Sequence, residues 1–141
     1  MTPRVVLDTN VVVSGLGWPG PPAAILDAVS DGRLVLVTSA PLLAELRRVL
    51  AYPKLAKVIR DAAQFAELIA SSSDVVTPAQ TLAVVDDESD NRVVEAAVEG
   101  AADYIVSGDA DLLDLGSFQG IPVFRPAEFV EKVLGSGADA E

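Results

Sequence analysis

Arg4-Val-Val-Leu-Asp8 is the stretch that decides the fold, a short run of β-branched and aliphatic residues that ends on a carboxylate. An unbroken apolar run of this length predicts a strand that is buried on both faces of a parallel sheet. Tyr104-Ile-Val-Ser-Gly-Asp109 has the same pattern much later in the chain, again with an acid at its end. Open α/β sheets bind ligands at the carboxyl ends of their strands. We therefore expect Asp8 and Asp109 to lie where a site would form.

Strand-like and helix-like segments alternate through the rest of the chain. Further strands are predicted at 33–38, 75–77 and 121–124, the last at a sheet edge because Pro122 cannot donate to a ladder. Helices are predicted at 22–30, 41–51, 53–60, 61–72, 90–99, 109–115 and 127–134. The order predicts an α/β fold, a three-layer α/β/α sandwich with a mainly parallel central sheet.

We expect one domain over residues 1–134, followed by a flexible C-terminal tail over 135–141. Gly15-Leu-Gly-Trp-Pro-Gly20 has the glycine spacing of a dinucleotide-binding turn. It begins seven residues after Asp8 and not directly after the strand, so we predict a loop there.

The composition excludes several kinds of active site. The 141 residues include no His and no Cys, so Ser-His-Asp triads, Cys-His pairs, disulfides and Cys/His zinc sites cannot form within the chain. Acids outnumber bases by 21 to 10, and the net charge of −11 argues against a generic DNA-coating role. Residues 8–10 interrupt the first apolar run, which therefore fits neither a signal peptide nor a membrane span. We expect a cytoplasmic protein without membrane contact.

Each candidate acid also has a structural interpretation. An Asp that follows a strand often caps the next helix, an interaction of about 1 kcal/mol. Capping alone is a weaker explanation when two acids, Asp8 and Asp109, follow two strands in the same way. Asp111, two residues beyond Asp109, adds a further carboxylate to the second strand end.

Two helices supply further candidate acids. Glu45 lies on the flank of an apolar helix stripe, where it could instead pair with Arg48 one turn later. Asp90 lies one turn before Val93 on an apolar face, which predicts that its carboxylate points inward. A buried charge has to be paired or bind a metal, because its burial otherwise costs several kcal/mol. Capping of the helix by Asp90 or Ser89 is the alternative.

Acidic and basic residues are unevenly distributed. Residues 86–114 contain ten acids and one base, and such a cluster is unfavourable unless a cation neutralises it. Oxygen-only ligands favour Mg²⁺, Mn²⁺ or Ca²⁺. Half of the bases lie together instead: Arg47, Arg48, Lys54, Lys57 and Arg60. They form either a solvated helix face or a positive rim that holds a phosphate backbone beside the acids.

Three segments together resemble a known family. They are Val6-Leu-Asp-Thr-Asn-Val11, Asp87-Glu-Ser-Asp-Asn-Arg-Val-Val-Glu-Ala96 and Ala102-Asp-Tyr-Ile-Val-Ser-Gly-Asp-Ala-Asp-Leu112. In this order they resemble the PIN domain, specifically the small prokaryotic PIN toxins of toxin–antitoxin pairs, which are VapC-like ribonucleases. The resemblance runs from Arg4 to about Val133.

This resemblance implies a metal-dependent endoribonuclease. Its catalytic acids would be Asp8, Glu45, Asp90 and Asp109, and Mg²⁺ or Mn²⁺ would be held by Asp8, Asp90 and Asp109 with Asp111 as an auxiliary acid. Asn10 and Ser107 would be polar supports. Family members often carry Pro where Glu88 stands, so Asp87 and Asp90 are alternatives for the third ligand, and the inward helix face favours Asp90. The implied partners are RNA, an antitoxin that blocks the cleft, and a second copy of the chain.

The resulting hypothesis is hydrolysis of RNA phosphodiester bonds without a covalent enzyme intermediate. A non-catalytic PIN-fold module, used for binding or as a scaffold, is the alternative, and titration with Mn²⁺ separates the two. A phosphotransfer receiver domain is a second alternative. It would need a Lys at a late strand end, where this chain has Arg125.

Overall fold

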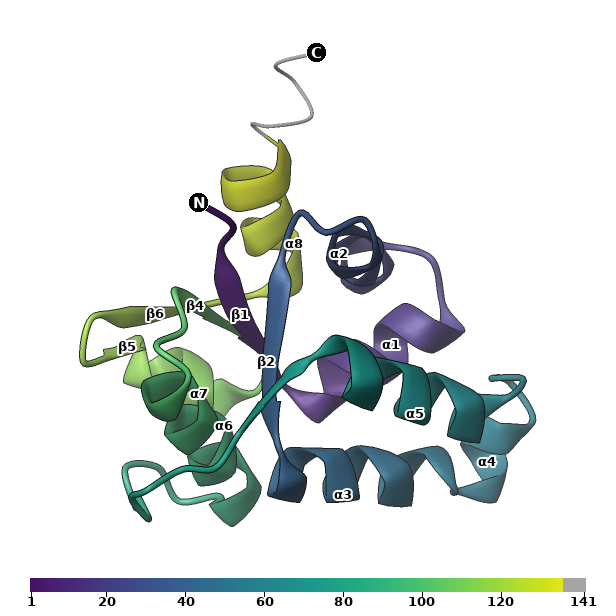
Figure 1. Cartoon of the computed structure of the whole chain (residues 1–141), viewed down its shortest axis with the longest axis horizontal. Coiled ribbons are helices and arrows are strands. Elements are labelled where there is room, and N and C mark those ends of the chain that lie inside the picture. Colours follow the sequence, from purple (N-terminus) through teal and green to yellow (C-terminus); the bar gives the residue numbers. More distant parts are fainter. Residues whose placement is uncertain (136–141) are drawn as a thin grey trace.

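Six strands form one sheet in the order β3-β2-β1-β4-β6-β5 (Figure 1). The computed structural model describes residues 1–135, so the predicted tail lies, beyond Gly135, outside the described residues. The strands are β1 (Arg4–Leu7), β2 (Val35–Ser39), β3 (Asp74–Val76), β4 (Tyr104–Val106), β5 (Ser117–Phe118) and β6 (Ile121–Phe124). All pairings are parallel except that of β5 with β6. The mainly parallel α/β sheet predicted from the sequence is confirmed.

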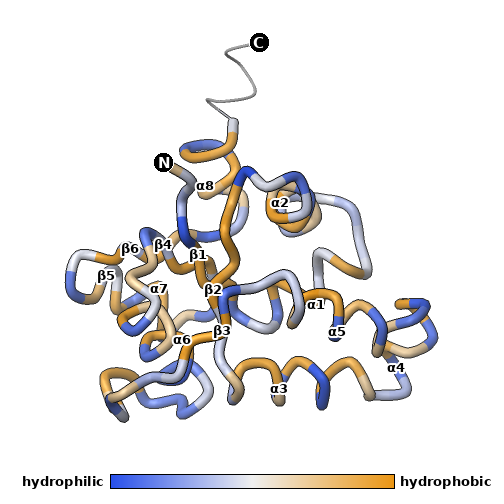
Figure 2. Tube along the Cα trace, in the orientation of Figure 1, coloured by the Kyte–Doolittle hydropathy of each residue, from blue (hydrophilic) through white to orange (hydrophobic). Residues whose placement is uncertain are grey.

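Helices cover both faces of this sheet. They are α1 (Thr9–Gly17), α2 (Pro21–Ser30), α3 (Ala40–Leu50), α4 (Pro53–Ala56), α5 (Ala62–Ser72), α6 (Glu88–Glu99), α7 (Ala110–Leu115), α8 (Pro126–Phe129) and the π-helical turn η1 (Val130–Leu134). Val5 and Leu7 of β1 face a core shared with α1, α2, α5 and α8, whereas Val6 faces a core shared with α6 and α7. The hydrophobic character of β2 between these layers is visible in Figure 2.

Helix α1 extends to Gly17 and so includes the first half of the segment 15–20, for which a loop was predicted. Its buried valines, Val11 to Val13, pack into the core beside β1. Gly15 lies against α2, where a Cβ would come within 2.7 Å of Leu26 Cδ1. Gly15 therefore permits close packing of α1 on α2, and only Trp18–Gly20 connects the two helices.

Strand β6 is not at the edge of the sheet, contrary to the prediction from Pro122. The two-residue strand β5 covers its outer side, with Ser117 opposite Pro122. Pairing with β4 begins only at Val123, so Pro122 precedes that ladder and its missing N–H costs nothing there. A strand as short as β5 carries no recognisable sequence pattern.

The parallel register places the chemistry-bearing residues at one end of the sheet. Leu7 pairs with Val106, so the residues that follow them, Asp8 and Ser107, emerge side by side. Strand β2 ends at Ser39 and leads directly into α3. Among residues 1–135 no helix is long and apolar enough to cross a membrane.

Candidate metal centre

A serine hydroxyl joins the ends of β1 and β4. Ser107 is fully buried and donates a hydrogen bond from its hydroxyl to Asp8 Oδ2 over 2.8 Å. The same hydroxyl accepts the backbone N–H of Asp109 over 2.9 Å. Asp8 makes no side-chain cap for α1, so the capping interpretation does not apply to it. Asp109 does cap its helix, because its Oδ1 accepts the backbone N–H of Asp111 over 2.9 Å.

Three carboxylates converge beside this junction. Asp90, Asp109 and Asp111 each place one carboxylate oxygen within 4.8 Å of the other two. Asp90 comes from the first turn of α6, and the other two come from the start of α7. Asp8 and Glu45 lie outside this group of three. The structure thus brings together three of the four predicted metal ligands, with Asp8 held next to them by Ser107.

Asp90 is the most strongly perturbed of these acids. It is only 4% exposed, and its Oδ2 is buried without a hydrogen-bond partner among the described residues. Burial raises the pKa of Asp90 to about 8, helped by the close approach of the Asp109 carboxyl group and by the negative charges of Asp109, Asp8 and Asp87. Burial likewise raises the pKa of Asp8, partly opposed by the hydrogen bond from Ser107. An acid that resists ionisation this strongly is poised to exchange its proton for a cation.

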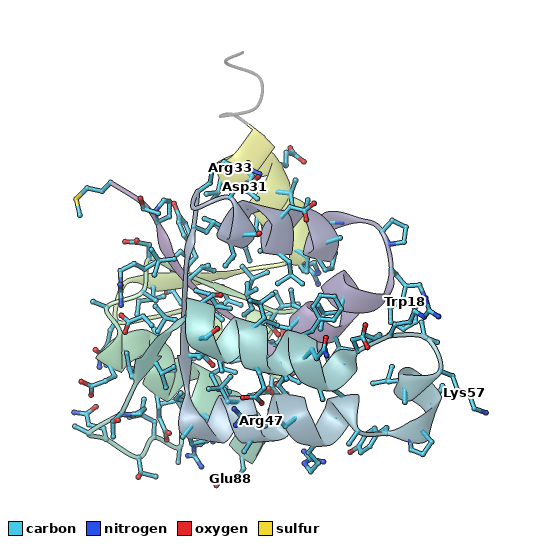
Figure 3. All side chains as sticks on the ribbon, turned by 45° about the vertical axis from the view of Figure 1, so that its right-hand side comes forward. Trp18, Asp31, Arg33, Arg47, Lys57 and Glu88 are labelled. Carbon is cyan, nitrogen blue, oxygen red and sulfur yellow. The ribbon has the colours of Figure 1, made fainter. Side chains whose placement is uncertain are left out.

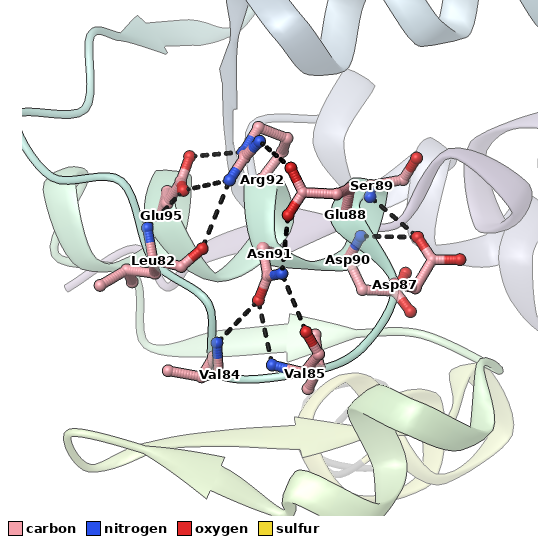
Figure 4. A network of polar contacts seen from close by, with 10 residues as sticks. All are labelled: Leu82, Val84, Val85, Asp87, Glu88, Ser89, Asp90, Asn91, Arg92 and Glu95. Atoms are coloured by element: carbon pink, nitrogen blue, oxygen red, sulfur yellow. Dashed lines mark hydrogen bonds and ion pairs between the residues drawn. The ribbon is translucent and has the colours of Figure 1, made fainter.

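Asp87 has a different place from Asp90. It is exposed and caps α6, with its Oδ1 accepting the backbone N–H groups of Ser89 and Asp90 over 2.8 and 3.3 Å (Figure 4). Helix α6 therefore begins at Glu88 and not at the predicted Asp90. Neither Asp90 nor Ser89 is the cap.

Asn91 and Glu95 hold the loop that precedes α6. The amide oxygen of Asn91 accepts both Val84 and Val85 backbone N–H groups at 3.0 Å, and its Nδ2 donates to the Val85 carbonyl at 2.9 Å (Figure 4). Glu95 accepts the Leu82 N–H at 2.7 Å and is paired with Arg92, whose nitrogens lie 2.6 and 2.7 Å from its carboxylate oxygens. These contacts fix the approach to Asp90, and sequence reasoning did not identify them. A polar Asn inside an amphipathic helix was the available signal.

Glu45 is linked to the first strand end through Thr9. The Thr9 hydroxyl donates to Glu45 Oε1 over 3.0 Å, and both side chains are partly or fully buried. Arg48 also lies 3.9 Å from Glu45 Oε2, so the predicted one-turn pair exists as well. Thr9 was missed from the sequence although it stands between two candidate residues. Asn10, a predicted support, is exposed and makes no side-chain hydrogen bond within residues 1–135.

The five clustered bases lie on α3, α4 and the segment after α4. Arg47 is engaged by Glu67 of α5 over 2.8 and 3.2 Å, and Figure 3 shows it on the α3 face. Lys54, Lys57 and Arg60 are exposed and form no ion pair with any described residue. Of the five clustered bases, Arg48 is the one that pairs with a candidate site acid, 3.9 Å from Glu45 Oε2.

A comparison of the sequence with protein-family models identifies the family. The model of the PIN domain matches residues 4–111, which include every acid of the centre. This chain belongs to the PIN domain family. The resemblance of the three sequence segments to the PIN domain is thereby confirmed, and membership supports a nuclease activity.

Relatives of this PIN domain span most of its length. The uncharacterized protein MJ1680 of Methanocaldococcus jannaschii is 34% identical over 116 residues, covering 79% of this chain and 74% of that protein. Among solved structures, a chain of VapBC2 from Rickettsia felis, bound to a DNA fragment from its promoter, superposes with a TM-score of 0.58 at 13% identity, covering 86% of this chain and 98% of the other. A chain of FitAcB from Neisseria gonorrhoeae superposes with a TM-score of 0.55 at 22% identity, covering 87% and 98%. These two likenesses show the fold.

Proposed function

We propose that this PIN domain is an endoribonuclease that hydrolyses RNA phosphodiester bonds with the help of Mg²⁺ or Mn²⁺. The observation that carries the proposal is the buried, unpartnered Oδ2 of Asp90 within a group of three converging carboxylates. A carboxylate oxygen left without a partner inside a protein costs several kcal/mol when it is ionised. A bound cation removes that cost.

The donor set fits a hard divalent ion. All three side chains offer oxygen, which Mg²⁺ and Mn²⁺ prefer over nitrogen or sulfur. Asp90, Asp109 and Asp111 would hold the ion, and Asp8 would face it from the adjoining strand end. When bound, such an ion polarises a phosphodiester and lowers the pKa of a bound water.

Neighbouring polar residues of this chain fix the positions of the candidate catalytic acids. Ser107 keeps Asp8 and the start of α7 in one arrangement through its two hydrogen bonds. Thr9 holds Glu45 at the flank of the centre, where its second oxygen faces Arg48. Acids that are fixed by neighbours need little reorganisation when charge develops at a reacting phosphate. No His or Cys is required, in keeping with a chain that has neither.

RNA is proposed as the substrate on two grounds. The PIN toxins that the sequence resembles are ribonucleases, and five of the ten bases lie within 47–60, beginning two residues after Glu45. Cations beside an acidic centre can hold a phosphate backbone near the ion.

We further propose that the chain is the toxin of a toxin–antitoxin pair, with an antitoxin as its partner and a second copy of itself in a homodimer. The sequence resemblance and the shared fold with the VapBC2 and FitAcB chains support this role. Growth after expression of this chain, alone and together with any small protein that a neighbouring gene encodes, tests the role. Arrest that the neighbour relieves is expected, and unaffected growth contradicts it.

The nuclease itself is tested by incubating RNA with the purified chain, with Mn²⁺ or with EDTA. Cleavage is expected with Mn²⁺ only, and Asp90→Asn and Asp109→Asn should each lower its rate by at least about a hundredfold, as loss of one strong transition-state contact does. Asp114→Asn, an exposed acid of α7 outside the centre, is the matched control. Undiminished cleavage by the Asp90 and Asp109 variants would refute the assignment.

A further inference from the structure

Two exposed aromatic rings lie beside the basic segment. Trp18 is 48% exposed and Tyr52 is 45% exposed, in a chain that contains one Trp and two Tyr. Burial of such rings is a large part of core stability, so leaving them at the surface has a cost unless a partner covers them. Neither ring contributes to the cores on the two faces of the sheet.

The two segments that carry Trp18 and the cations are in contact. A Cβ on Gly17, the residue before Trp18, would lie 3.4 Å from Ile59 Cγ1 and 3.9 Å from Val58 Cγ1. Val58 and Ile59 stand between Lys57 and Arg60, so the end of α1 packs directly on the basic segment. In Figure 3, Trp18 and Lys57 project from the same side of the molecule.

The Tyr52 ring is held by a side-chain contact, and the backbone that carries Trp18 is fixed. The Arg48 guanidinium donates to the Tyr52 hydroxyl over 2.8 Å. Trp18 closes α1 by donating its backbone N–H to the Ser14 carbonyl, and Pro19 follows it, so the local backbone has little freedom. Preorganised rings lose little entropy when a flat partner stacks on them.

The charge of this surface is opposite to that of the rest of the chain. Residues 47–60 contain five cations and no acid, whereas the whole chain carries a net charge of −11. Asp61 follows directly but forms no ion pair with these cations among residues 1–135. Arg48 also contacts Glu45, whose charge acts on Asp8, so side chains in contact lead from the flank of the acidic centre to Tyr52.

Exposed aromatic rings interleaved with cations match the chemistry of a single nucleic-acid strand, whose bases stack and whose phosphates pair with Lys and Arg. We propose that Trp18 and Tyr52, with Arg48, Lys54, Lys57 and Arg60, form a binding surface for single-stranded RNA that leads to the acidic centre. We name these six residues the α4 surface. The choice of RNA rests on the proposed nuclease function, which this inference deepens.

Binding of a short fluorescein-labelled single-stranded RNA, followed by anisotropy in EDTA, tests the α4 surface without cleavage. Trp18→Ala and Tyr52→Ala should each weaken binding by about 5- to 150-fold, the effect of losing one stacked base. Tyr52→Phe keeps the ring and should bind more tightly than Tyr52→Ala. Phe65→Ala, which removes a ring that is 39% exposed on α5, is the control and should bind as wild type.

The cations are tested by the salt dependence of the same binding. Lys54→Glu combined with Lys57→Glu should reduce the slope of log K against log salt by about 1.4, since each phosphate contact of a single strand contributes about 0.7. Arg33→Glu combined with Lys132→Glu makes the same change of charge elsewhere, where both cations are paired with acids. Equal effects of the two double variants would overturn the proposal.

Three further outcomes would also overturn it: no binding by the wild type, equally tight binding of an RNA duplex, or displacement of the RNA by polyglutamate at equal charge. The last would indicate an acidic protein segment as the occupant. Because binding is measured without metal, its outcome is independent of the cleavage assay. Selective binding without cleavage would refute the nuclease and retain the surface, and cleavage without selective binding would do the reverse.

Discussion

Replacing Asp90 with Asn should make the metal-free protein more stable while removing its affinity for metal. The wild-type carboxylate is 4% exposed, one of its oxygens has no partner among the described residues, and the charges of Asp109, Asp8 and Asp87 oppose its ionisation. Asn has nearly the same shape without the charge. The variant therefore retains the packing of α6 and stays uncharged without having to retain a proton or bind a cation.

The size of the effect follows from proton linkage. The pKa of Asp90 rises from 3.8 to about 8 on folding, so between these values the folded protein keeps a proton that the unfolded chain has released. The free energy of unfolding of the wild type then falls as pH rises, by up to about 1.4 kcal/mol per pH unit. The amide of the Asp90→Asn variant has no proton to release, so the advantage of the variant over wild type grows by about 2 to 3 kcal/mol from about pH 5 to about pH 7.

Urea denaturation in EDTA at several pH values measures this difference, with Asp114→Asn as the control for the loss of one exposed carboxylate. A second measurement is the change in the free energy of unfolding when Mn²⁺ is added. Mn²⁺ at about a hundred times its Kd should stabilise the wild type by about 2.7 kcal/mol and leave Asp90→Asn unchanged. An advantage of Asp90→Asn that stays constant with pH, or is no larger than that of Asp114→Asn, would refute the reasoning.

Three further substitutions test the supports of the site. Ser107→Ala leaves Asp8 and a buried backbone N–H without their partner, so urea denaturation should show a loss of about 1 to 3 kcal/mol; a wild-type value would contradict the junction. Asn91→Ala removes three hydrogen bonds to the preceding loop, and the two loop amides should exchange hydrogen faster than in the wild type; unchanged exchange would argue against this anchor. Gly100→Ala places a methyl group against Val37 and should cost about 1 to 3 kcal/mol of stability, whereas Gly108→Ala, which meets open space, is the control; equal melting temperatures for the two would be inconsistent with the packing.

The local pattern of apolar and polar residues was sufficient to predict most of the strands and helices. The buried runs at 4–7 and 104–106 became adjacent parallel strands, and the amphipathic segments became α3, α5 and α6. Helix α1 was missed because its valines and glycines have low helix propensity. Burial of Val11 to Val13 in the core outweighs that propensity. The wrong edge assignment of β6 has a similar origin, since β5 is recognisable only by its pairing.

The candidate site, too, could be predicted from the sequence only in part. Acids at strand ends and on an inward helix face could be named from position alone, because the periods of strands and helices are local properties. The group of Asp90, Asp109 and Asp111 could not be separated from Asp8 and Glu45 in this manner. Neither could the capping role of Asp87, which depends on where α6 begins.

The sequence by itself determined the kinds of chemistry open to this protein: a carboxylate centre without imidazole or thiol, on a parallel α/β fold of the PIN domain family. Only the tertiary structure decided which oxygens meet. Ser107 and Asp8 are 99 residues apart along the chain and 2.8 Å apart in the fold, and Thr9 reaches Glu45 across 36 residues. Such contacts depend on how strands and helices pack, and the packing is set by side chains of the whole core and not by the neighbours of any one acid.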